Sequence, residues 1–276
     1  MDIVGEGHSI RRKCKVLGIR RQSYYRRKAG HRPEAADKQI TALLHETVGI
    51  YLAWGFWMIF YYLRRQGHKW NHKKVYRIWK AEGLNLRKPP KRSKLKRVFQ
   101  DLIAPQQINQ GWAMDFLSDW VVGLDKQTVR LINLIDECSR KALWTEAYSS
   151  ISAKTLIGIL DQLLLWRGKP QYIRCDNGPE FISKDLAKWA EKNQVELRFI
   201  QPGKPTQNGL IERLNGTLRR ECLNLEWFES LEYLNEQLQK WSLIYNNLRP
   251  HSSIGYKTPD EIELLNQNLY FKPVAA

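Results

Sequence analysis

The sequence predicts an α/β protein in which a mixed-sheet core follows an N-terminal, all-helical region of helix-turn-helix type. Two patterns and the length lead to this fold class. Apolar residues alternate over residues 111–122, 128–137 and 142–148, which indicates three consecutive strands, and helical segments then alternate with short strands. Before residue 86 the apolar spacing is helical instead. With 276 residues, of which 43% are hydrophobic, the chain can bury one substantial core and a smaller module.

The positive charge of the chain is concentrated in its first third. The formal net charge is +17, which favours a polyanionic partner. Residues 7–33 carry ten Lys or Arg and no acid, and residues 64–97 carry fourteen against Glu82 alone. Residues 98–276 carry twenty basic and twenty-two acidic residues. We therefore expect one region to hold DNA and a different, nearly neutral region to act on it.

Residues 1–32 are interpreted as a basic helical segment. A basic run is often only a solvated face or a disordered tail, but here aliphatic and aromatic residues interrupt it. Leu17-Gly18-Ile19 predicts a turn between two short helices, of which the second, near residues 22–27, would enter a major groove. The predicted DNA contacts in this segment are Arg20, Arg21, Arg26 and Arg27.

Residues 33–85 predict a second helical DNA-binding module. Asn71 suits the N-cap of its last helix, and Gly83 suits the stop at the other end. The periodicity predicts helices over residues 37–47, 56–66 and 71–82. The last of these sets basic residues around an apolar face, and its predicted DNA contacts are Lys73, Lys74 and Arg77.

Residues 86–105 predict an extended basic linker. Adjacent prolines and a run of Lys and Arg without an acid make a packed element improbable over residues 86–97. We expect Arg92 and Lys96 to lie along DNA, and the alternative is a spacer that is only flexible.

An uncharged stretch, residues 47–63, is at the short limit for a membrane span. Gly49 and Gly55 interrupt it and its flanks are basic, so we expect a small helical core, no membrane partner and a cytoplasmic protein. The four cysteines are dispersed, which argues against a zinc site.

Three acidic residues stand in distinctive contexts within the predicted core, residues 106–226. Asp115 is mid-strand by pattern, on the face opposite Trp112 and Met114. Asp176 ends a short apolar run just before the turn signal Asn-Gly-Pro, and therefore lies at the carboxyl end of a strand. Glu212 lies in a helical pattern for which Thr206 and Asn208 are candidate caps. Three carboxylates brought to one point can hold divalent cations for phosphodiester chemistry.

Two further features belong to this region. Arg219 follows Glu212 by two helical turns, so both project from one face and the cation could grip DNA phosphate. Asp119 and Asp136 are other strand carboxylates, and we expect a structural role for Asp136 near its strand end. Beyond the core, residues 227–276 predict a C-terminal helix and a tail that pack on it.

Several stretches of sequence and one interval carry a family resemblance. Between Asp176 and Glu212 lie 35 residues. The stretches are Trp112-x-x-Asp115, Asp176-Asn-Gly-Pro-Glu-Phe181, Gln201-Pro-Gly-Lys-Pro-Thr-Gln-Asn-Gly-Leu-Ile-Glu212-Arg, and the tail from Tyr245 to Thr258-Pro259. With them the chain resembles the DDE recombinases, specifically the bacterial insertion-sequence transposases of insertion sequence family three, second reading frame (OrfB).

The resemblance implies a retroviral-integrase-like, RNase H-type core in which Asp115, Asp176 and Glu212 are the catalytic and metal-binding residues. It implies Mg²⁺ or Mn²⁺, two ions per active site, roughly 3.5–4 Å apart. The implied partners are double-stranded DNA with terminal inverted repeats and target DNA, with action as a homo-oligomer and a possible upstream-frame partner or fusion. Gln207, Asn208 and Arg219 are the core residues expected to contact DNA.

Two other functions stay open from the sequence. One is a DNA-binding regulator without catalysis, and the other is a simple RNase H-like nuclease that cuts without joining. An intact acidic triad argues against the first, and the separate N-terminal modules argue against the second.

Overall fold

The computed structural model describes residues 9–22, 24, 35–86, 105–122, 126–201 and 205–270. The predicted DNA contacts Arg26, Arg27, Arg92 and Lys96 lie outside these residues, as does most of the predicted linker. The chain divides into two compact units, which are described separately. Among the described residues, no helix is long and apolar enough to cross a membrane.

The first unit is helical, as predicted. Its helices are α1 (Ile10–Val16), α3 (Ala35–Ile50) and α5 (His72–Ala81). A turn follows α1 at Leu17 and Gly18, where the sequence predicts one. The Asn71 side chain accepts a hydrogen bond from the backbone N–H of Lys73 and so caps α5. Gly83, just beyond the other end, has a φ of +69°, which a residue without a Cβ adopts at little cost.

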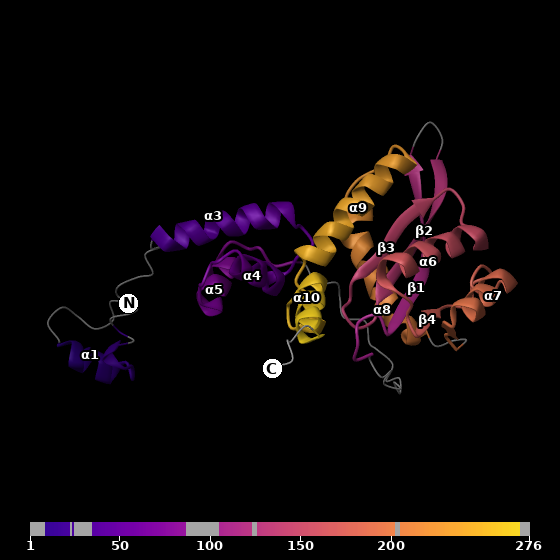
Figure 1. The fold of residues 1–276 in the computed structure, drawn as a ribbon. Helices are drawn as coiled ribbons and strands as arrows, with labels where there is room; N and C mark the ends of the chain where they lie inside the picture. Colours follow the sequence, from indigo (N-terminus) through magenta and orange to yellow (C-terminus); the bar gives the residue numbers. More distant parts are fainter. Residues whose placement is uncertain are drawn as a thin grey trace, which may run out of the picture. The chain divides into compact units, whose positions relative to one another are not determined.

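The second unit is built on a five-stranded mixed sheet in the order β3-β2-β1-β4-β5 (Figure 1). The strands are β1 (Gly111–Val122), β2 (Lys126–Asp136), β3 (Ala142–Tyr148), β4 (Tyr172–Cys175) and β5 (Glu196–Phe199). The first three are antiparallel neighbours, whereas β4 and β5 run parallel to β1. The predicted fold class, an α/β mixed sheet behind a helical N-terminal region, is therefore confirmed.

Helices cover both faces of this sheet and pack on different residues of β1. On one face, α6 (Ala153–Arg167) and α7 (Lys184–Asn193) form a core with Trp112 and Met114. On the other face, α8 (Gly209–Leu218) and α9 (Leu231–Asn247) pack on Ala113 and Val121. The predicted alternation along β1 is thus confirmed, and it places Asp115 on the face that α8 covers.

Short helical turns and two further helices complete the second unit. The turns are η1 (Pro205–Asn208), the π-helical η2 (Arg219–Leu223) and η3 (Ser252–Ile254), and the helices are α4 (Phe56–Arg65) and α10 (Pro259–Tyr270). Tyr61 of α4 stacks on Tyr256, with ring centroids 4.3 Å apart. Arg65 lies 3.7 Å from Glu261 at the start of α10.

Side-chain amides of α9 complete the outer edge of the sheet. Strand β3 is an edge strand, and such an edge presents unpaired backbone groups. Asn235 bonds both the N–H and the carbonyl of Ala147, and Asn246 does the same at Ala142, all at 2.8–2.9 Å. The eleven helical positions between the two amides span about 16 Å, and five strand positions span about the same. The matched spacing fixes α9 alongside β3.

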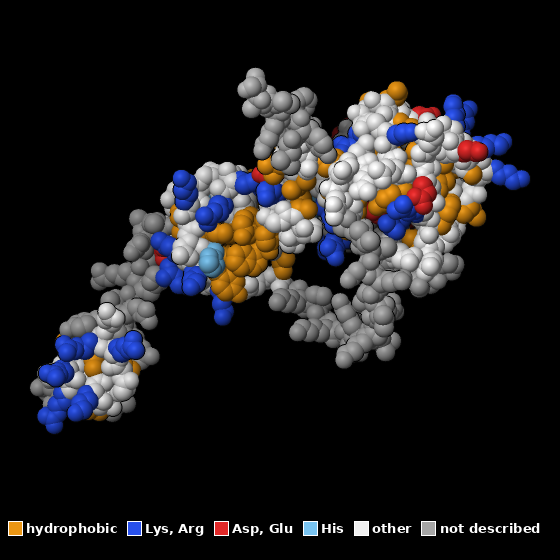
Figure 2. Space-filling model, turned by 60° about the horizontal axis from the view of Figure 1, so that its bottom comes forward, with side chains coloured by type: hydrophobic (Ala, Val, Ile, Leu, Met, Phe, Trp, Pro, Cys, Tyr) orange, Lys and Arg blue, Asp and Glu red, His pale blue; other side chains and the backbone are white. Residues whose placement is uncertain are grey.

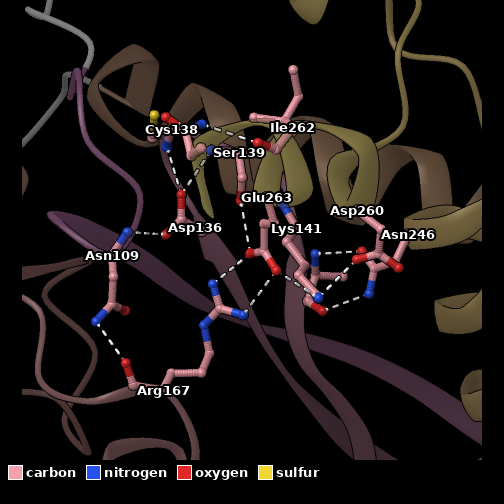
Figure 3. Close-up of polar contacts among 12 residues, drawn as sticks. Asn109, Asp136, Cys138, Ser139, Lys141, Arg167, Asn246, Asp260, Ile262 and Glu263 are labelled. Atoms are coloured by element: carbon pink, nitrogen blue, oxygen red, sulfur yellow. Dashed lines mark hydrogen bonds and ion pairs between the residues drawn. The ribbon is translucent and has the colours of Figure 1, made fainter. Parts of the chain in front are cut away.

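A charged cluster ties α10 to the carboxyl end of β2 (Figure 3). The carboxylate of Glu263 on α10 forms ion pairs with Arg167 at 2.5 Å and with Lys141 at 2.8 Å. Asp136 is fully buried and accepts backbone N–H groups of Asn109, Cys138 and Ser139. The expected structural role of Asp136 near its strand end is therefore confirmed, and burial raises its pKa despite these bonds.

Candidate active site

The parallel register of β1 and β4 brings Asp115 and Asp176 side by side. The register pairs Gly111 with Tyr172 and Ala113 with Arg174. Continuing it by two positions sets Asp176, just beyond the end of β4, opposite Asp115 on the neighbouring strand. Adjacent strands lie about 4.8 Å apart. The two aspartates are thus neighbours in space although 60 residues separate them in the chain.

The start of this register depends on a close approach of backbone and side chain. A Cβ placed on Gly111 would lie 2.2 Å from the ring of Tyr172, so only glycine fits at this position of β1. The hydroxyl of Tyr172 donates a hydrogen bond to Glu137 at 2.6 Å, and Arg174 also donates to that buried carboxylate at 2.7 Å. These contacts hold β4 against β1 just ahead of the two aspartates.

The turn after β4 holds the Asp176 carboxylate from one side. Its Oδ1 accepts the backbone N–H of Gly178 at 2.9 Å. The side chain of Asn177 donates to the carbonyl of Ile200 at 2.9 Å, which fixes the turn to the chain beyond β5. Phe181, at the end of the same turn, is fully buried in the core. The Asn-Gly-Pro signal thus forms the expected turn, and its backbone orients the acid.

Helix α8 brings Glu212 to the same place. Ile211, Leu214 and Leu218 are buried against the sheet, as the helical spacing predicts, and Glu212 is exposed beside them. One turn after Glu212, Asn215 donates a hydrogen bond from Nδ2 to Oδ2 of Asp115 at 2.8 Å. Its own Oδ1 accepts from Asn133, the residue of β2 that pairs with Asp115. One amide therefore joins α8 to two neighbouring strands.

The expected caps of this helix need a correction. Asn208 occupies the N-cap position, but its side chain makes no capping hydrogen bond, and Thr206 lies within the short turn η1 that precedes α8. Asn208 is only 3% exposed. Its buried Oδ1 has no hydrogen-bond partner among the described residues. The short η1 turn, which the sequence pattern does not predict, supplies the entry to α8 instead.

The three acids influence one another electrostatically. The pKa of Asp115 is raised to about 6, mainly by burial and then by the neighbouring charge of Asp176, with a smaller contribution from Glu212. Hydrogen bonds from the Phe116 backbone and from Asn215 oppose the rise. Within the part of the chain that the structure describes, no three His, Cys, Asp or Glu side chains already lie close enough to hold a metal ion. The site is a crowded acidic group that a cation would draw together.

A second group of contacts, which the sequence pattern does not predict, fixes the Asp176 turn to the sheet. Arg130 of β2 forms an ion pair with Glu180, and its guanidinium lies 4.5 Å from the ring centroid of Phe116. Phe116 stacks in turn on Phe181, with centroids 4.5 Å apart and planes 7° apart. Arg130 holds the pKa of the Glu180 carboxyl below its usual range. The pairing of Arg130 with Ser118 across the sheet makes this contact possible, and no local sequence signal reveals it.

The other residues expected near the site have protein partners. Arg219 donates to the carbonyl of Ser118 at 2.9 Å and lies 3.6 Å from Asp119, which faces it across the sheet surface. Gln207 accepts the backbone N–H of Gln201 at 2.8 Å. Cys175, next to Asp176, is fully buried, and burial raises its pKa to about 12, so it is an inert strand residue.

The predicted contacts of the helical unit are partly surface side chains. Figure 2 shows Lys and Arg side chains gathered over α1. Arg20 and Arg21 follow that helix and are exposed, and Lys73 is exposed on α5. Lys74 and Arg77 instead form ion pairs with the buried Asp37, at 2.8 and 2.7 Å. These two residues have a structural partner that the sequence pattern does not reveal.

Comparison with protein families matches the regions before residue 93 and after residue 104 to different families. Residues 105–205 and residues 193–259 each match a family described as an integrase core domain. Residues 32–92 match a family described as an HTH-like domain. The integrase matches include the two aspartates and Glu212, and the HTH-like match includes α3, α4 and α5.

Individual proteins resemble the chain over most of its length. An uncharacterized 31.7 kDa protein of insertion element IS407 from Burkholderia multivorans is 34% identical over 254 residues, which is 92% of this chain and 90% of the relative. Transposase InsD of insertion element IS2 from Escherichia coli is 24% identical, covering 82% and 78%. The catalytic core domain of an HTLV-2 integrase, solved with magnesium, covers 56% of this chain and 96% of that chain at 22% identity and a TM-score of 0.42.

Proposed function

Because this chain belongs to the insertion-sequence transposases of insertion sequence family three, OrfB type, we propose that Asp115, Asp176 and Glu212 carry out its DNA cleavage and strand transfer. The single observation that carries the proposal is the β1–β4 register, which sets Asp176 beside Asp115. The hydrogen bond of Asn215, one turn after Glu212, to Asp115 and the raised pKa of Asp115 agree with it. One acid from a strand, one from the turn after a strand and one from a helix would together bind a scissile phosphate through metal ions. A partly buried carboxylate whose pKa is raised by burial and by neighbouring acids is typical of a functional site.

The donor set fits a divalent cation. Carboxylate oxygens are the ligands that Mg²⁺ and Mn²⁺ prefer, and the repulsion that raises the pKa of Asp115 would be relieved by a bound positive charge. Asp115, Asp176 and Glu212 would hold two such ions. When bound, the ions would supply Lewis-acid stabilisation of the charge that develops at the phosphate and would make the attacking hydroxyl more acidic.

The remaining chemistry is positioning by the residues of this chain. Asn215 orients Asp115 and favours its ionised form, because an N–H donates a stronger hydrogen bond to a carboxylate than to the neutral acid. The backbone N–H of Gly178 holds the Asp176 carboxylate in its orientation by a hydrogen bond at 2.9 Å. The side chain of Arg219, which is 40% exposed, lies two turns beyond Glu212 and would contact a DNA phosphate near the cleaved bond. No covalent intermediate with the protein is needed, because water or a DNA 3′-hydroxyl is the nucleophile.

DNA is held by a different part of the chain from the part that cuts it. The HTH-like region and the basic residues before it would bind the terminal inverted repeat, and Arg20, Arg21 and Lys73 are its exposed candidates. The core after residue 98 is nearly neutral, so phosphate attraction there is weak. The proposed sequence of steps is nicking at one element end, joining to the other end as a circle, and integration into target DNA. We further propose that the protein acts as a homo-oligomer, alone or fused to an upstream-frame product.

The test is a strand-transfer assay with the full-length protein, Mg²⁺ and oligonucleotides that carry the element ends found beside the gene. Asp115→Asn, Asp176→Asn and Glu212→Gln should each lower nicking and joining by at least roughly a hundredfold while DNA affinity stays unchanged. Asp185→Asn on the exposed start of α7 is the matched control and should keep full activity.

The outcomes distinguish three functions. Joining that depends on all three acids supports the transposase mechanism. Nicking without joining would identify a simple nuclease, and DNA binding with neither reaction would identify a regulator. Wild-type joining by Asp115→Asn would show that the carboxylates are not the catalytic group.

A further inference from the structure

A hollow of about 290 Å³ lies at the far end of the strand that carries Asp115. Asp119 and Trp120 of β1, Arg219 and Leu223 of η2, and the loop through Trp227 line it. Trp227 is 74% exposed and Trp120 43% exposed, so two large aromatic side chains border the hollow at the surface. The role proposed above for the three acids does not use this hollow.

The walls of the hollow are fixed by hydrogen bonds. The backbone N–H of Val122 donates to the carbonyl of Phe228 at 2.7 Å, which fastens the loop to the end of β1. The Arg219 guanidinium donates to the carbonyl of Ser118, and the backbone N–H of Asn224 donates to the carbonyl of Arg219 at 2.8 Å. On the loop, Glu226 accepts the hydroxyl of Tyr233 at 2.9 Å. The hollow is therefore a preformed feature of the fold.

The position of the hollow relates it to the three acids. Asp115 and Asp119 lie on the same face of β1 four residues apart, which is about 13 Å at strand spacing. Glu212 and Arg219 are seven helical positions apart, which is about 10 Å. At about 3.4 Å per stacked nucleotide, the hollow lies three to four nucleotides from a phosphate held by the acids.

The charges around the hollow select the kind of group that it can take. One cation, Arg219, is accompanied by two carboxylates, Asp119 and Glu226, so the hollow itself carries net negative charge and would repel a phosphate inside it. The exposed part of Arg219 can still contact a phosphate outside the hollow. A neutral, flat ring can stack on the tryptophans, and carboxylates accept hydrogen bonds from amino groups on base edges. The volume admits one ring system and excludes a base pair with its backbone.

We propose that this hollow captures one unpaired nucleobase of the DNA end, three to four nucleotides from the cleaved bond. The inference rests on the proposed function, since it takes the acids as the place where DNA is cut. Base stacking on Trp227 and Trp120 supplies the affinity, and Asp119 and Glu226 favour a base with an amino group over thymine. Capture holds the strand end open after the duplex has parted and keeps it beside the acids.

The test uses full-length Asp115→Asn protein, which binds but does not cut, and element-end duplexes whose last four nucleotides are unpaired in one strand or the other. Binding is measured by fluorescence anisotropy. Trp227→Ala should weaken binding roughly fivefold to a hundredfold, the range for loss of one stacked base. In the protein that keeps Trp227, removing the base at the captured position should weaken binding by the same factor. Combining the substitution with the abasic DNA should weaken binding no further. Thymine at that position should also bind more weakly than cytosine.

The matched control is Trp166→Ala, because Trp166 is 69% exposed on α6 and outside the hollow. It should leave binding unchanged. Base capture would be overturned if Trp227→Ala weakened binding equally on intact and on abasic DNA. It would also be overturned if Trp227→Ala did not weaken binding to any of the duplexes. The proposed function is judged separately by joining in otherwise wild-type protein, so either idea can fail while the other stands. Thermal melting of Trp227→Ala confirms that the variant is folded.

Discussion

Asn215 donates a hydrogen bond to Asp115 at 2.8 Å while accepting one from Asn133, the cross-strand partner of Asp115. The contact joins the helix of Glu212 to the strand of Asp115. It also opposes the rise in the pKa of Asp115 that burial and the neighbouring acids cause. A neutral amide thereby favours the ionised form of a partly buried carboxylate.

Replacing Asn215 should impair catalysis through Asp115. Asn215→Ala removes the donor, so the pKa of Asp115 should rise further above 6 and the carboxylate should lose its fixed orientation. We expect joining to slow by roughly tenfold to a hundredfold. The acid limb of the pH–rate profile should also move to higher pH, which a merely destabilised fold would not produce. Asn215→Asp, which adds a fourth acid, should move the limb further still.

Asp115→Asn should stabilise the metal-free protein near neutral pH. The pKa of Asp115 is about 6 in the folded state, against 3.8 as the reference value, so folding favours the protonated form. The stability from that form is present below pH 3.8 and is lost as the pH rises through 6. Because the substitution also weakens the hydrogen bonds that the Asp115 carboxylate accepts, the free energy of unfolding of the variant should rise by only about 1–2 kcal/mol at pH 7.5. Urea unfolding should show this gain shrinking toward pH 4, and a constant gain would contradict the assignment.

The ion pair of Arg130 and Glu180 should matter for catalysis more than for stability. It fixes the turn after Asp176 to the strand that pairs with β1, with Phe116 and Phe181 stacked beneath it. Arg130→Gln and Glu180→Gln should each slow joining several-fold without changing DNA affinity. If the residues act as a pair, the double variant should lose little more than either single one. If the double variant lost the full sum of the two single effects on the joining rate, expressed as activation free energies, the proposed coupling would be contradicted.

The buried His251 should make the protein less stable in mild acid. Burial and the adjacent Arg249 lower its pKa to about 3, and its Nε2 lies 3.2 Å from the carbonyl of Tyr245. The folded state therefore keeps His251 neutral, whereas the unfolded chain takes up a proton below about pH 6.5. The stabilising contribution of neutral His251 is fully present above pH 6.5. Below that pH the free energy of unfolding falls by about 1.4 kcal/mol per pH unit. His251→Gln should be less stable at pH 7.5 but should show a shallower slope between pH 6.5 and 5.

Much of the fold could be predicted from periodicity alone. The strands at residues 111–122 and 142–148 have the predicted bounds, because their apolar residues alternate against two different helical layers. The cap at Asn71 and the stop at Gly83 were also predictable, since capping is decided within a few residues. Asn208 stands at the predicted N-cap position of α8, but its buried side chain makes no capping hydrogen bond.

For the candidate site, too, some features follow from the local sequence and others depend on tertiary contacts. By itself, the sequence determined the local setting of Asp115, Asp176 and Glu212, because a strand, a turn and a helix are written in nearby residues. Only the tertiary structure decided that the register of β1 and β4 sets the aspartates side by side, that Asn215 bonds Asp115, and that Arg130 reaches Glu180. Those contacts join residues 50 to 100 positions apart. They depend on how strands align and helices pack, which no short sequence pattern specifies.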